Sequence, residues 1–450
     1  MSNLTQLRLA AREIFSEVLH AVDAGAAVRC RVRLRDSLLE VCDTTTDIGN
    51  RPVYSIAIGK AAFKMASALE EILGERLTTG IIAGNEPRLN HANGETPQFG
   101  KLRHTVFLGG HPEPNEQSLA AARACFDLLD RANQEHALVI FLVSGGGSAM
   151  IERPINPDIT LSELRAANKA LVNSGASIAE INAVRRSFSA VKGGRLAARA
   201  PNCDQITLIV SDVPAGEERN VASGPSLDAP DDAPDARAVI ARYKLAPLLP
   251  ASVLRATKAP PAPIASESES LRQHFVLLDN QSALDAAAQV AQRHGYQTEI
   301  AWEISDQPIE SGCSQLFDKL ADLQARRAAN ETPTVCLISG GEFACPVRGG
   351  GIGGRSLETA LRLACSTNLR WPENQHFVAI CAGTDGIDGN SPAAGAIVDS
   401  STRMRAESIG LDPGDFLARS DAYSFFVALG DALTTGPTGT NVRDLRILLG

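Results

Sequence analysis

The sequence predicts an α/β protein of two domains. Short apolar runs alternate with stretches of helical periodicity, and a chain of 450 residues is too long for one comfortable hydrophobic core. The apolar content of 44% and the charged content of 21% are ordinary for a globular protein, while aromatic residues make up only 4%. Aliphatic side chains therefore carry the apolar load, as they do in layered α/β cores.

The first half opens with an amphipathic helix and continues as βα units. Between Leu4 and Val22, apolar side chains fall on one helical face. A strand is predicted at Val53–Ile58, and its helix follows Gly59. Further strands are predicted at Gly80–Ala83, Thr105–Leu108, Ala137–Val143 and Gln205–Val210, with helices at Asn115–Arg131 and Leu161–Val172. This alternation predicts a parallel sheet with helices on both faces.

A proline-rich stretch separates the two halves. Eight of the 24 prolines lie between Pro225 and Pro263, and proline interrupts regular structure. We expect domains at residues 1–245 and 246–450; a long surface excursion inside one domain is the alternative. The second half again alternates, with strands expected at Phe275–Leu278, Thr298–Trp302, Thr334–Ile338, Phe343–Val347 and Phe377–Ala382, and helices at Ser282–His294, Gly312–Ala329, Ser356–Ala364, Arg403–Ile409 and Ala422–Leu429.

Charge and cysteine content exclude several classes of protein. With 43 basic and 52 acidic residues the net charge is −9, so neither nucleic acid nor an anionic membrane is an expected partner. No apolar run approaches the ~20 residues of a membrane span, and the N-terminal helix is not a signal peptide, so we expect a cytoplasmic protein. The nine cysteines form no C-x-x-C pair, which indicates buried thiols and not disulfides or zinc ligands.

Four glycine-rich loops, each after an apolar run, carry the candidate site. The first is Ser144-Gly145-Gly146-Gly147-Ser148, directly after the strand predicted at Ala137–Val143. Its backbone N–H groups suit a phosphate or carboxylate, and a structural turn is the alternative. The G-x-x-x-x-G-K-[ST] spacing of a Walker A loop is missing. The other three loops are Gly340-Gly341-Glu342, Gly349–Arg355 and Gly383-Thr384-Asp385-Gly386. Four such loops indicate a phosphate-handling enzyme.

Charged residues at strand ends supply what a bound phosphate needs. Asp212 follows the strand at Gln205–Val210, where many nucleotide enzymes hold Mg²⁺; a helix cap or turn is an equal alternative. Lys60 follows Gly59, where a solvated lysine is the simpler interpretation. His111 lies in a turn and is left out of the candidate set.

The loop at Gly349–Arg355 matches G-x-G-x-x-G, the pattern of dinucleotide-binding proteins. That pattern requires a strand directly before it and an acidic residue about 20 positions later. Neither requirement is met convincingly. We therefore interpret it as a loop that places Arg355 at a helix start, facing an anion.

Together these segments resemble the glycerate 2-kinase family, whose C-terminal half is the MOFRL domain. The resemblance runs from Gly59-Lys60-Ala61-Ala62 to residues 436–442, through residues 110–112, 144–149, 180–185, 192–196, 211–214, 222–225, 353–355 and 383–389. It implies a Rossmann-like three-layer N-terminal domain and a smaller α/β C-terminal domain that contains the MOFRL region, at about 333–445. The active site would lie in the cleft between the domains.

The resemblance also implies an activity, the ATP- and Mg²⁺-dependent phosphorylation of the 2-hydroxyl of D-glycerate. The functional cluster that it implies is Lys60, Asp212, Glu342, Arg355, Asp385 and Asn441. In this interpretation, Lys60 and Arg355 neutralise the transferring group, and Asp212 and Glu342 hold Mg²⁺. Asp385 orients or deprotonates the acceptor hydroxyl, and Asn441 holds a substrate oxygen. The triple-glycine loop binds a phosphate or the glycerate carboxylate.

Three departures from the family pattern keep alternatives open. Ser356-Leu357 stands where the family has N-Q, Ala215 begins a segment where a G-D-D-type run is usual, and Asn390 replaces the start of a P-T-D run. The alternatives are a kinase of another small sugar acid, an NAD(P)H-dependent hydroxypyruvate reductase, which is a name that relatives also carry, and a non-catalytic sensor. A homodimer is also left open.

Overall fold

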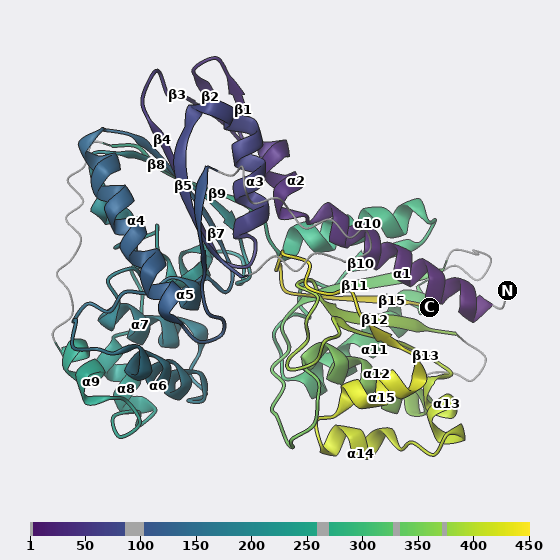
Figure 1. The fold of residues 1–450 in the computed structure, drawn as a ribbon. Helices are drawn as coiled ribbons and strands as arrows, with labels where there is room; N and C mark the ends of the chain where they lie inside the picture. Colours follow the sequence, from purple (N-terminus) through teal and green to yellow (C-terminus); the bar gives the residue numbers. More distant parts are fainter. Residues whose placement is uncertain (1–2, 86–102, 259–269, 327–333, 371–375) are drawn as a thin grey trace. The chain divides into compact units, whose positions relative to one another are not determined.

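The computed structural model describes residues 3–85, 103–258, 270–326, 334–370 and 376–450. The chain forms two compact α/β units, each with its own sheet (Figure 1). The N-terminal unit is Ala24–Leu277, and the C-terminal unit joins Met1–Asp23 to Leu278–Gly450. The units divide at Leu277/Leu278, whereas the expected boundary was 245/246, and the first helix belongs to the second unit.

Helix α1 (Asn3–Ala21) explains why the N-terminus joins the C-terminal unit. Its apolar stripe, which includes Ile14 and Val18, is buried against α10 (Asn280–Arg293) and strands β12 (Val378–Gly383) and β15 (Asp444–Leu449). Arg8 on the same helix pairs with the buried carboxylates of Asp399 and Asp431. The predicted amphipathic helix is confirmed, and its apolar face covers the second sheet.

The N-terminal unit is built on a six-stranded sheet with the order β6-β5-β4-β7-β8-β9. The pairings from β6 through β8 are parallel. The strands are β4 (Val53–Ile58), β5 (Leu77–Gly84), β6 (His104–Leu108), β7 (Leu138–Ser144), β8 (Asp204–Val210) and β9 (Arg272–Leu278). Helices α3 (Ala62–Leu73) and α4 (Glu116–Gln134) pack on this sheet. The strand order reverses between β4 and β7, and in such sheets ligands bind at the carboxyl ends of the strands beside that switch point.

Two smaller parts of the N-terminal unit were not predicted, apart from one helix, at Leu161–Val172, which the structure confirms. Helix α2 (Ala24–Arg31) leads into a three-stranded antiparallel sheet of β1 (Val32–Arg35), β2 (Leu38–Val41) and β3 (Thr44–Asp47). A helical group, with its own apolar core around Leu164, Val184 and Phe188, lies at the other end of this unit in Figure 1. Its helices are α6 (Leu161–Val172), α7 (Ile178–Phe188), α8 (Ala236–Arg242) and α9 (Ala251–Lys258).

The C-terminal unit has a mixed sheet with the order β10-β11-β15-β12-β13-β14. Besides β12 and β15, its strands are β10 (Gln297–Ile300), β11 (Val335–Gly341), β13 (Gly395–Asp399) and β14 (Ala432–Leu433). Helices α1 and α10 cover one face (Figure 1). The other helices are α11 (Ile309–Ala325) and α12 (Arg355–Arg370) on the opposite face, with α13 (Thr402–Ser408), α14 (Pro413–Ala418) and α15 (Ala422–Leu429) beside α12. The central strand β15 was missed, and the expected strand at Phe343–Val347 forms only an isolated bridge at Ala344.

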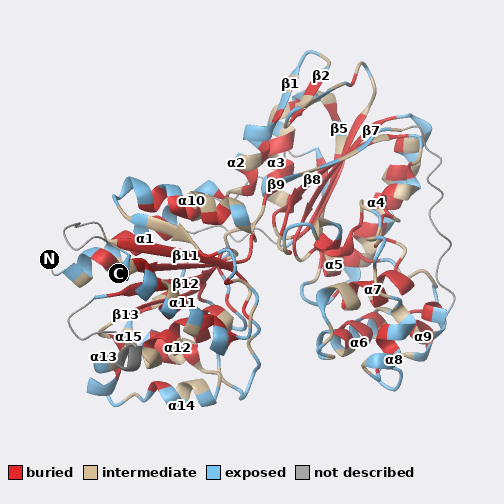
Figure 2. Cartoon of the chain, turned by 180° about the vertical axis from the view of Figure 1, so that it is seen from behind, coloured by how far each residue is buried: buried red, intermediate tan, exposed pale blue. Residues whose placement is uncertain are grey.

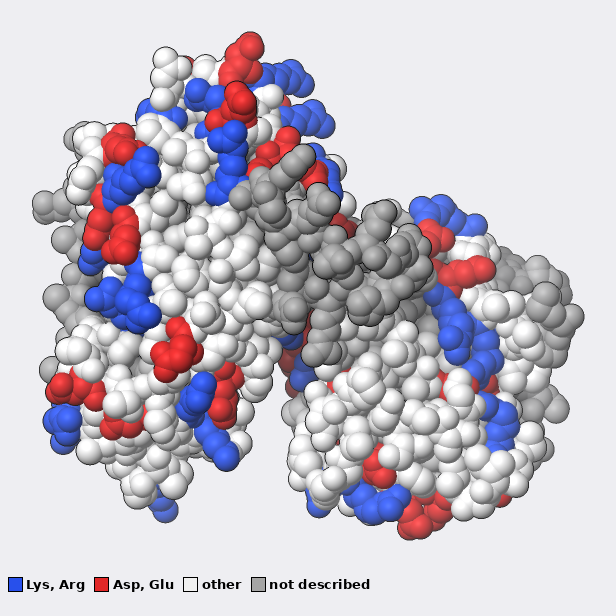
Figure 3. Space-filling model, in the orientation of Figure 1, with Lys and Arg blue, Asp and Glu red and all other residues white. Residues whose placement is uncertain are grey.

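Burial in each unit follows from this layering. The strands β4, β7, β11 and β12 are buried along their whole length, whereas the helices expose their outer faces (Figure 2). On the face of each unit seen in Figure 3, basic and acidic side chains of the described residues are interspersed. None of the helices in the described ranges is long and apolar enough to cross a membrane.

Candidate active site

The predicted polar residues of the C-terminal unit meet at one edge of its sheet. Strand β15 runs antiparallel between β11 and β12, so its start lies beside the ends of both neighbours. Asp444 pairs with Gly341 at the end of β11 and with Gly383 at the end of β12. Glu342 and Asp385, which follow those strands, are therefore brought to the same edge as Asn441.

Arg355 is the first residue of α12 and lies at the centre of this polar group. Its Nη2 donates to Glu342 Oε1 at 2.7 Å, and its Nε donates to Asp444 Oδ2, also at 2.7 Å. Burial acts to lower the pKa of Arg355, but the charges of Asp444 and Glu342 outweigh it and raise the pKa above its usual value. The two carboxylates fix the direction of the guanidinium, and its contact with a bound anion stays a prediction.

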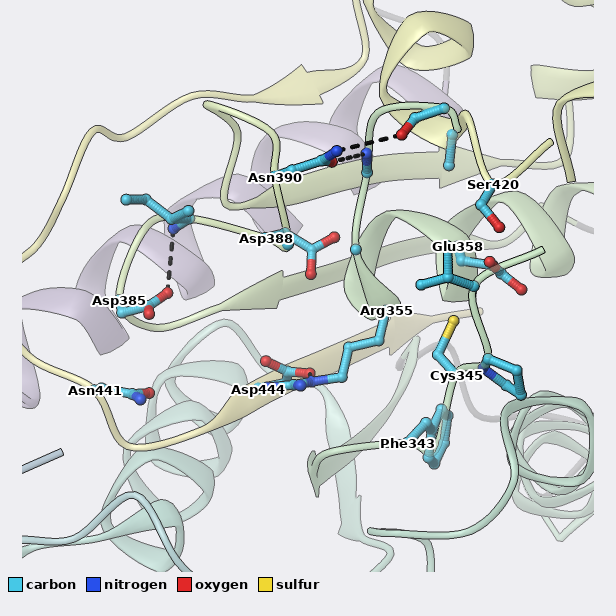
Figure 4. A pocket seen from close by; sticks show the side chains of 18 residues that line it. Phe343, Cys345, Arg355, Glu358, Asp385, Asp388, Asn390, Ser420, Asn441 and Asp444 are labelled. Atoms are coloured by element: carbon cyan, nitrogen blue, oxygen red, sulfur yellow. Dashed lines mark hydrogen bonds and ion pairs between the residues drawn. The ribbon is translucent and has the colours of Figure 1, made fainter. Parts of the chain in front are cut away.

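Arg355 and Asp444 line a cavity of about 420 Å³ within the C-terminal unit (Figure 4). Its polar wall includes Arg355, Asp385, Asp388, Asn441 and Asp444, and Phe343 and Ala422 contribute apolar surface. With Glu358 and Asn390, which also line it, the cavity has one guanidinium, four carboxyl groups and two amides, and so both signs of charge. Such a site can hold a polar ligand in a defined orientation.

The side chain of Asp388 caps the N-terminus of helix α12. Its carboxylate accepts the backbone N–H groups of Ser356 at 3.1 Å and Leu357 at 2.7 Å, which have no intrahelical partner. The loops approach closely, since a Cβ on Gly354 would stand 2.4 Å from Asp388 Oδ1. Burial and then the charge of Asp444 raise the pKa of Asp388 to about 7, while the two N–H groups and Arg355 oppose the rise.

This raised pKa predicts a pH-dependent difference in stability between the wild type and Asp388→Asn. Below the ordinary pKa of 3.8 the carboxyl is protonated in both the folded and the unfolded state, and the stability contribution is fully present. It is lost as the pH rises through about 7, because ionisation is easier in the unfolded chain. We expect the melting temperature of the wild type to fall relative to that of Asp388→Asn between pH 5 and pH 8. A constant difference, or the same trend in the exposed control Asp415→Asn, would contradict the assignment.

The N-terminal unit brings its predicted residues together at the switch point of its sheet. Strand β4 ends before Gly59-Lys60, and the neighbouring β7 ends at Ser144. The Lys60 N–H donates to Gly145 O at 2.9 Å, and Ser144 Oγ accepts the Ala61 N–H at 3.0 Å. The two loops therefore hold each other, and a Cβ on Gly59 would stand 2.3 Å from Ser144 O.

Asp212 and Lys60 both lie against the triple-glycine loop. A Cβ on Gly145 would stand 1.8 Å from Asp212 Oδ2, and a Cβ on Gly146 would stand 3.1 Å from Lys60 Cγ and 3.3 Å from His111 Cε1. Gly146 has a φ of +79°, which a side chain would strain. His111, which was left out of the candidate set, therefore lies beside Gly146, as Lys60 does.

The predicted cluster thus forms two local groups. Lys60, Asp212 and the loop from Ser144 to Ser148 are gathered in the N-terminal unit, and the remaining residues, Glu342, Arg355, Asp385 and Asn441, are gathered in the C-terminal unit. Asp388 and Asp444 were missed. A weak signal for Asp444 existed, because it directly precedes the mainly apolar segment Leu445–Leu449, which is interrupted by Arg446.

Two of the residues that depart from the family pattern, Asn390 and Leu357, have structural roles. Asn390 Oδ1 accepts the Gly353 N–H at 2.8 Å, and its Nδ2 donates to Gly351 O at 3.3 Å, so it supports the glycine loop before Arg355. Leu357 is fully buried in the core. The same loop lacks the strand that a dinucleotide fingerprint requires, since β11 ends at Gly341 and α12 begins at Arg355.

The carboxylates of Asp212 and Glu342 are chemically suitable ligands for Mg²⁺, although they do not by themselves complete its coordination. Carboxylate and amide oxygens are the ligands that Mg²⁺ prefers, and it commonly takes one or two carboxylates together with substrate phosphates. Across the described ranges, no group of three or more His, Cys, Asp or Glu residues is placed to hold a metal ion. Metal binding by Asp212 and Glu342 stays a prediction.

Each unit of this two-domain α/β protein gathers a cation, at least one carboxylate and glycine turns at its strand ends. The "Domain of unknown function (DUF4147)" model matches residues 10–258, and the "MOFRL family" model matches residues 335–444. A D-glycerate 2-kinase of Thermotoga maritima is 35% identical over 88% of this chain and 90% of its own length. A putative hydroxypyruvate reductase of Agrobacterium vitis is 34% identical over 88% of this chain and 98% of its own.

A solved structure is also similar to this chain over nearly its whole length. The crystal structure of a glycerate kinase from Thermotoga maritima superposes with a TM-score of 0.78 at 31% identity, covering 99% of both chains. The chain therefore belongs to the glycerate kinase family, whose members combine the DUF4147 and MOFRL domains.

Proposed function

We propose that this protein is an ATP-dependent kinase that phosphorylates the 2-hydroxyl of D-glycerate to give 2-phosphoglycerate. The observation that carries the proposal is the Arg355 group, a guanidinium held by two carboxylates in the wall of a cavity. A D-glycerate 2-kinase among the relatives supports the substrate and the position of transfer.

The residue types suit phosphoryl transfer, in which catalysis consists mainly of positioning and charge stabilisation. Arg355 is fixed in direction before any substrate binds, so it can meet the transferring group without reorganisation. Lys60 supplies a second cation, and Asp385 accepts or orients the proton of the acceptor hydroxyl. Asn441 holds a substrate oxygen, and the loop from Ser144 to Ser148 binds a phosphate or carboxylate.

The proposal requires both units to act on one pair of substrates, in a cleft between them. Asp212 in one unit and Glu342 in the other would hold Mg²⁺, which would neutralise charge on the phosphate oxygens. Removal of Mg²⁺ by a chelator should therefore abolish turnover.

The test is an assay of the purified protein with ATP, Mg²⁺ and D-glycerate, coupled to enolase, which uses 2-phosphoglycerate and not its 3-isomer. Immediate formation of phosphoenolpyruvate is the expected result. Consumption of ATP without that product would indicate phosphorylation of the 3-hydroxyl. No consumption of ATP would overturn the proposal for glycerate and direct a search to larger sugar acids.

A second candidate is a hydroxypyruvate reductase, because a relative of equal coverage carries that name. The loop from Gly349 to Gly354 argues against it, since it follows an irregular segment where a dinucleotide site needs a strand. Oxidation of NADPH or NADH in the presence of hydroxypyruvate would favour the reductase.

A further inference from the structure

A cluster of basic side chains in the N-terminal unit lies outside the predicted site. Helix α7 carries Arg185 and Arg186, and the turn after it carries Lys192 and Arg195. Lys192 and Arg186 are 1% and 6% exposed. We call these four residues the cation cluster. Among the ion pairs of the described residues it has one carboxylate, Glu152, which Lys192 contacts.

The other three members of the cluster have neutral hydrogen-bond partners, and the charge of Glu152 only partly opposes the lowering of the pKa of Arg185 and Arg195 by burial. Arg195 donates to the backbone oxygens of Arg186, Ser189 and Lys192, and Arg185 Nε donates to Asn168 Oδ1 at 2.9 Å. Such partners satisfy hydrogen bonds but do not balance charge. Buried charges are normally paired, because desolvation without a counter-charge is unfavourable. The cluster therefore has an excess of positive charge that an anion would compensate.

Arg186 is the member of the cluster with an unsatisfied hydrogen-bond donor. Its Nη1 donates to Asn220 Oδ1 at 3.3 Å, whereas its Nη2 is buried and has no hydrogen-bond partner in the described part of the chain. Burial lowers the pKa of Arg186, and the neighbouring Arg195 lowers it further. An unmade hydrogen bond of a charged group costs more than that of a neutral one.

Neutral polar groups connect Arg186 to the triple-glycine loop. Asn182 Nδ2 donates to Asn220 O at 3.4 Å, and Asn182 Oδ1 accepts from Ser223 Oγ at 2.8 Å. Ser223 Oγ lies 2.9 Å from Ser148 Oγ, and the Ser148 carbonyl accepts from Lys192 Nζ at 2.9 Å. The cation cluster and the loop therefore border one continuous polar region.

The segment that supplies Ser223 is held in an unfavourable conformation. Ala222 and Ser223 have φ values of +52° and +64°, in the left-handed region that non-glycine residues rarely adopt. Strain of this kind persists where surrounding structure enforces it, and it is concentrated at ligand sites. Here it directs the Ser223 hydroxyl between Asn182 and Ser148.

We propose that the cation cluster binds the carboxylate of the acid substrate, with Arg186 as the residue that contacts it. This inference rests on the proposed function and extends it to the group that recognises the acid. A guanidinium binds a planar two-oxygen group in a bidentate manner, and a carboxylate is smaller than a phosphate, which suits an almost fully buried nitrogen. A nucleotide phosphate is also an anion that a guanidinium can bind, so the test must distinguish binding of the acid from binding of the nucleotide.

The kinetic test compares Arg186→Met with the wild type, using D-glycerate and its neutral analogue glyceramide. We expect the KM for D-glycerate to rise roughly 10- to 100-fold, with the KM for ATP and the kcat close to wild type. The variant should also lose the preference for glycerate over glyceramide. The control is Arg76→Met, because Arg76 also has a buried nitrogen without a partner in the described residues. Arg76 directly precedes β5 and so lies at the amino end of that strand, whereas the triple-glycine loop follows the carboxyl end of β7. A raised KM for ATP alone, or no change in either KM, would overturn the proposal.

A binding measurement separates this inference from the proposed function. D-glycerate should raise the melting temperature of the wild type and not that of Arg186→Met. Without ligand the variant should be at least as stable as the wild type, whereas a purely structural arginine would lower stability when removed. If D-glycerate stabilises the wild type but is not phosphorylated, the function fails and the site stands. If it is phosphorylated while Arg186→Met shows wild-type KM and wild-type stabilisation, the site alone fails.

Discussion

Replacement of Arg355 by glutamine should lower kcat by roughly 10²- to 10³-fold, the range found when one preorganised donor to a developing charge is removed. The guanidinium is held by Glu342 and Asp444 before substrate binds. The wild-type side chain therefore needs no reorganisation to meet the transferring group, and a glutamine cannot form the same two ion pairs. Glutamine fills similar space but lacks the charge. The measurement is the rate of ADP formation at saturating ATP and D-glycerate, together with the melting temperature of the variant.

The matched control is Arg362→Gln. Arg362 lies two turns further along α12 and also pairs with carboxylates, those of Glu358 and Glu310, but it is not part of the cavity wall. We expect turnover within a few-fold of wild type. An equal loss in both variants would show that Arg355 acts through the stability of the helix, and near-normal turnover of Arg355→Gln would remove it from the site.

The sequence predicted the N-terminal sheet well because its signals are local. Each parallel strand is a short apolar run, and glycine follows within two residues of all of these runs except Gln205–Val210, which leads into Ser211-Asp212. The structure confirms the five strands predicted in the first half, with small shifts at their ends. The small sheet β1–β3 was missed because its strands are four residues long and only partly buried. Such strands have no apolar run to distinguish them from loops.

The C-terminal site could be predicted only in part, because its geometry depends on a distant strand. The positions of Glu342 and Asp385 after strands were readable, but their meeting requires β15, which comes more than 50 residues after β12 and runs antiparallel to it. Asp444 lies at the start of its strand, whereas the predicted residues Glu342 and Asp385 follow the ends of theirs. Asp388 was quoted in a motif, yet its contact with the helix start arises from a loop crossing that no spacing encodes.

Replacement of Gly145 by alanine should reduce turnover by about 10²-fold, the loss typical of a misplacement of about 1 Å at a reacting centre. The new Cβ would stand 1.8 Å from Asp212 Oδ2 and 2.3 Å from its Cγ, so the carboxylate must rotate away from the loop. The φ of Gly145 is not in the left-handed region, and the displaced atoms are at the end of a side chain. We therefore expect little change in melting temperature and a large change in activity.

Asp212 is proposed to hold Mg²⁺, so the same variant should need a higher Mg²⁺ concentration for half-maximal rate. Gly350→Ala is the control, because a Cβ there meets no atom within 4 Å and should leave both turnover and the Mg²⁺ requirement unchanged. A Gly145→Ala variant that unfolds would indicate that the glycine serves packing between the two loops. A stable variant with normal turnover would show that Asp212 is not needed beside the triple-glycine loop, and the metal would then have to be held by the carboxylates around Arg355 alone.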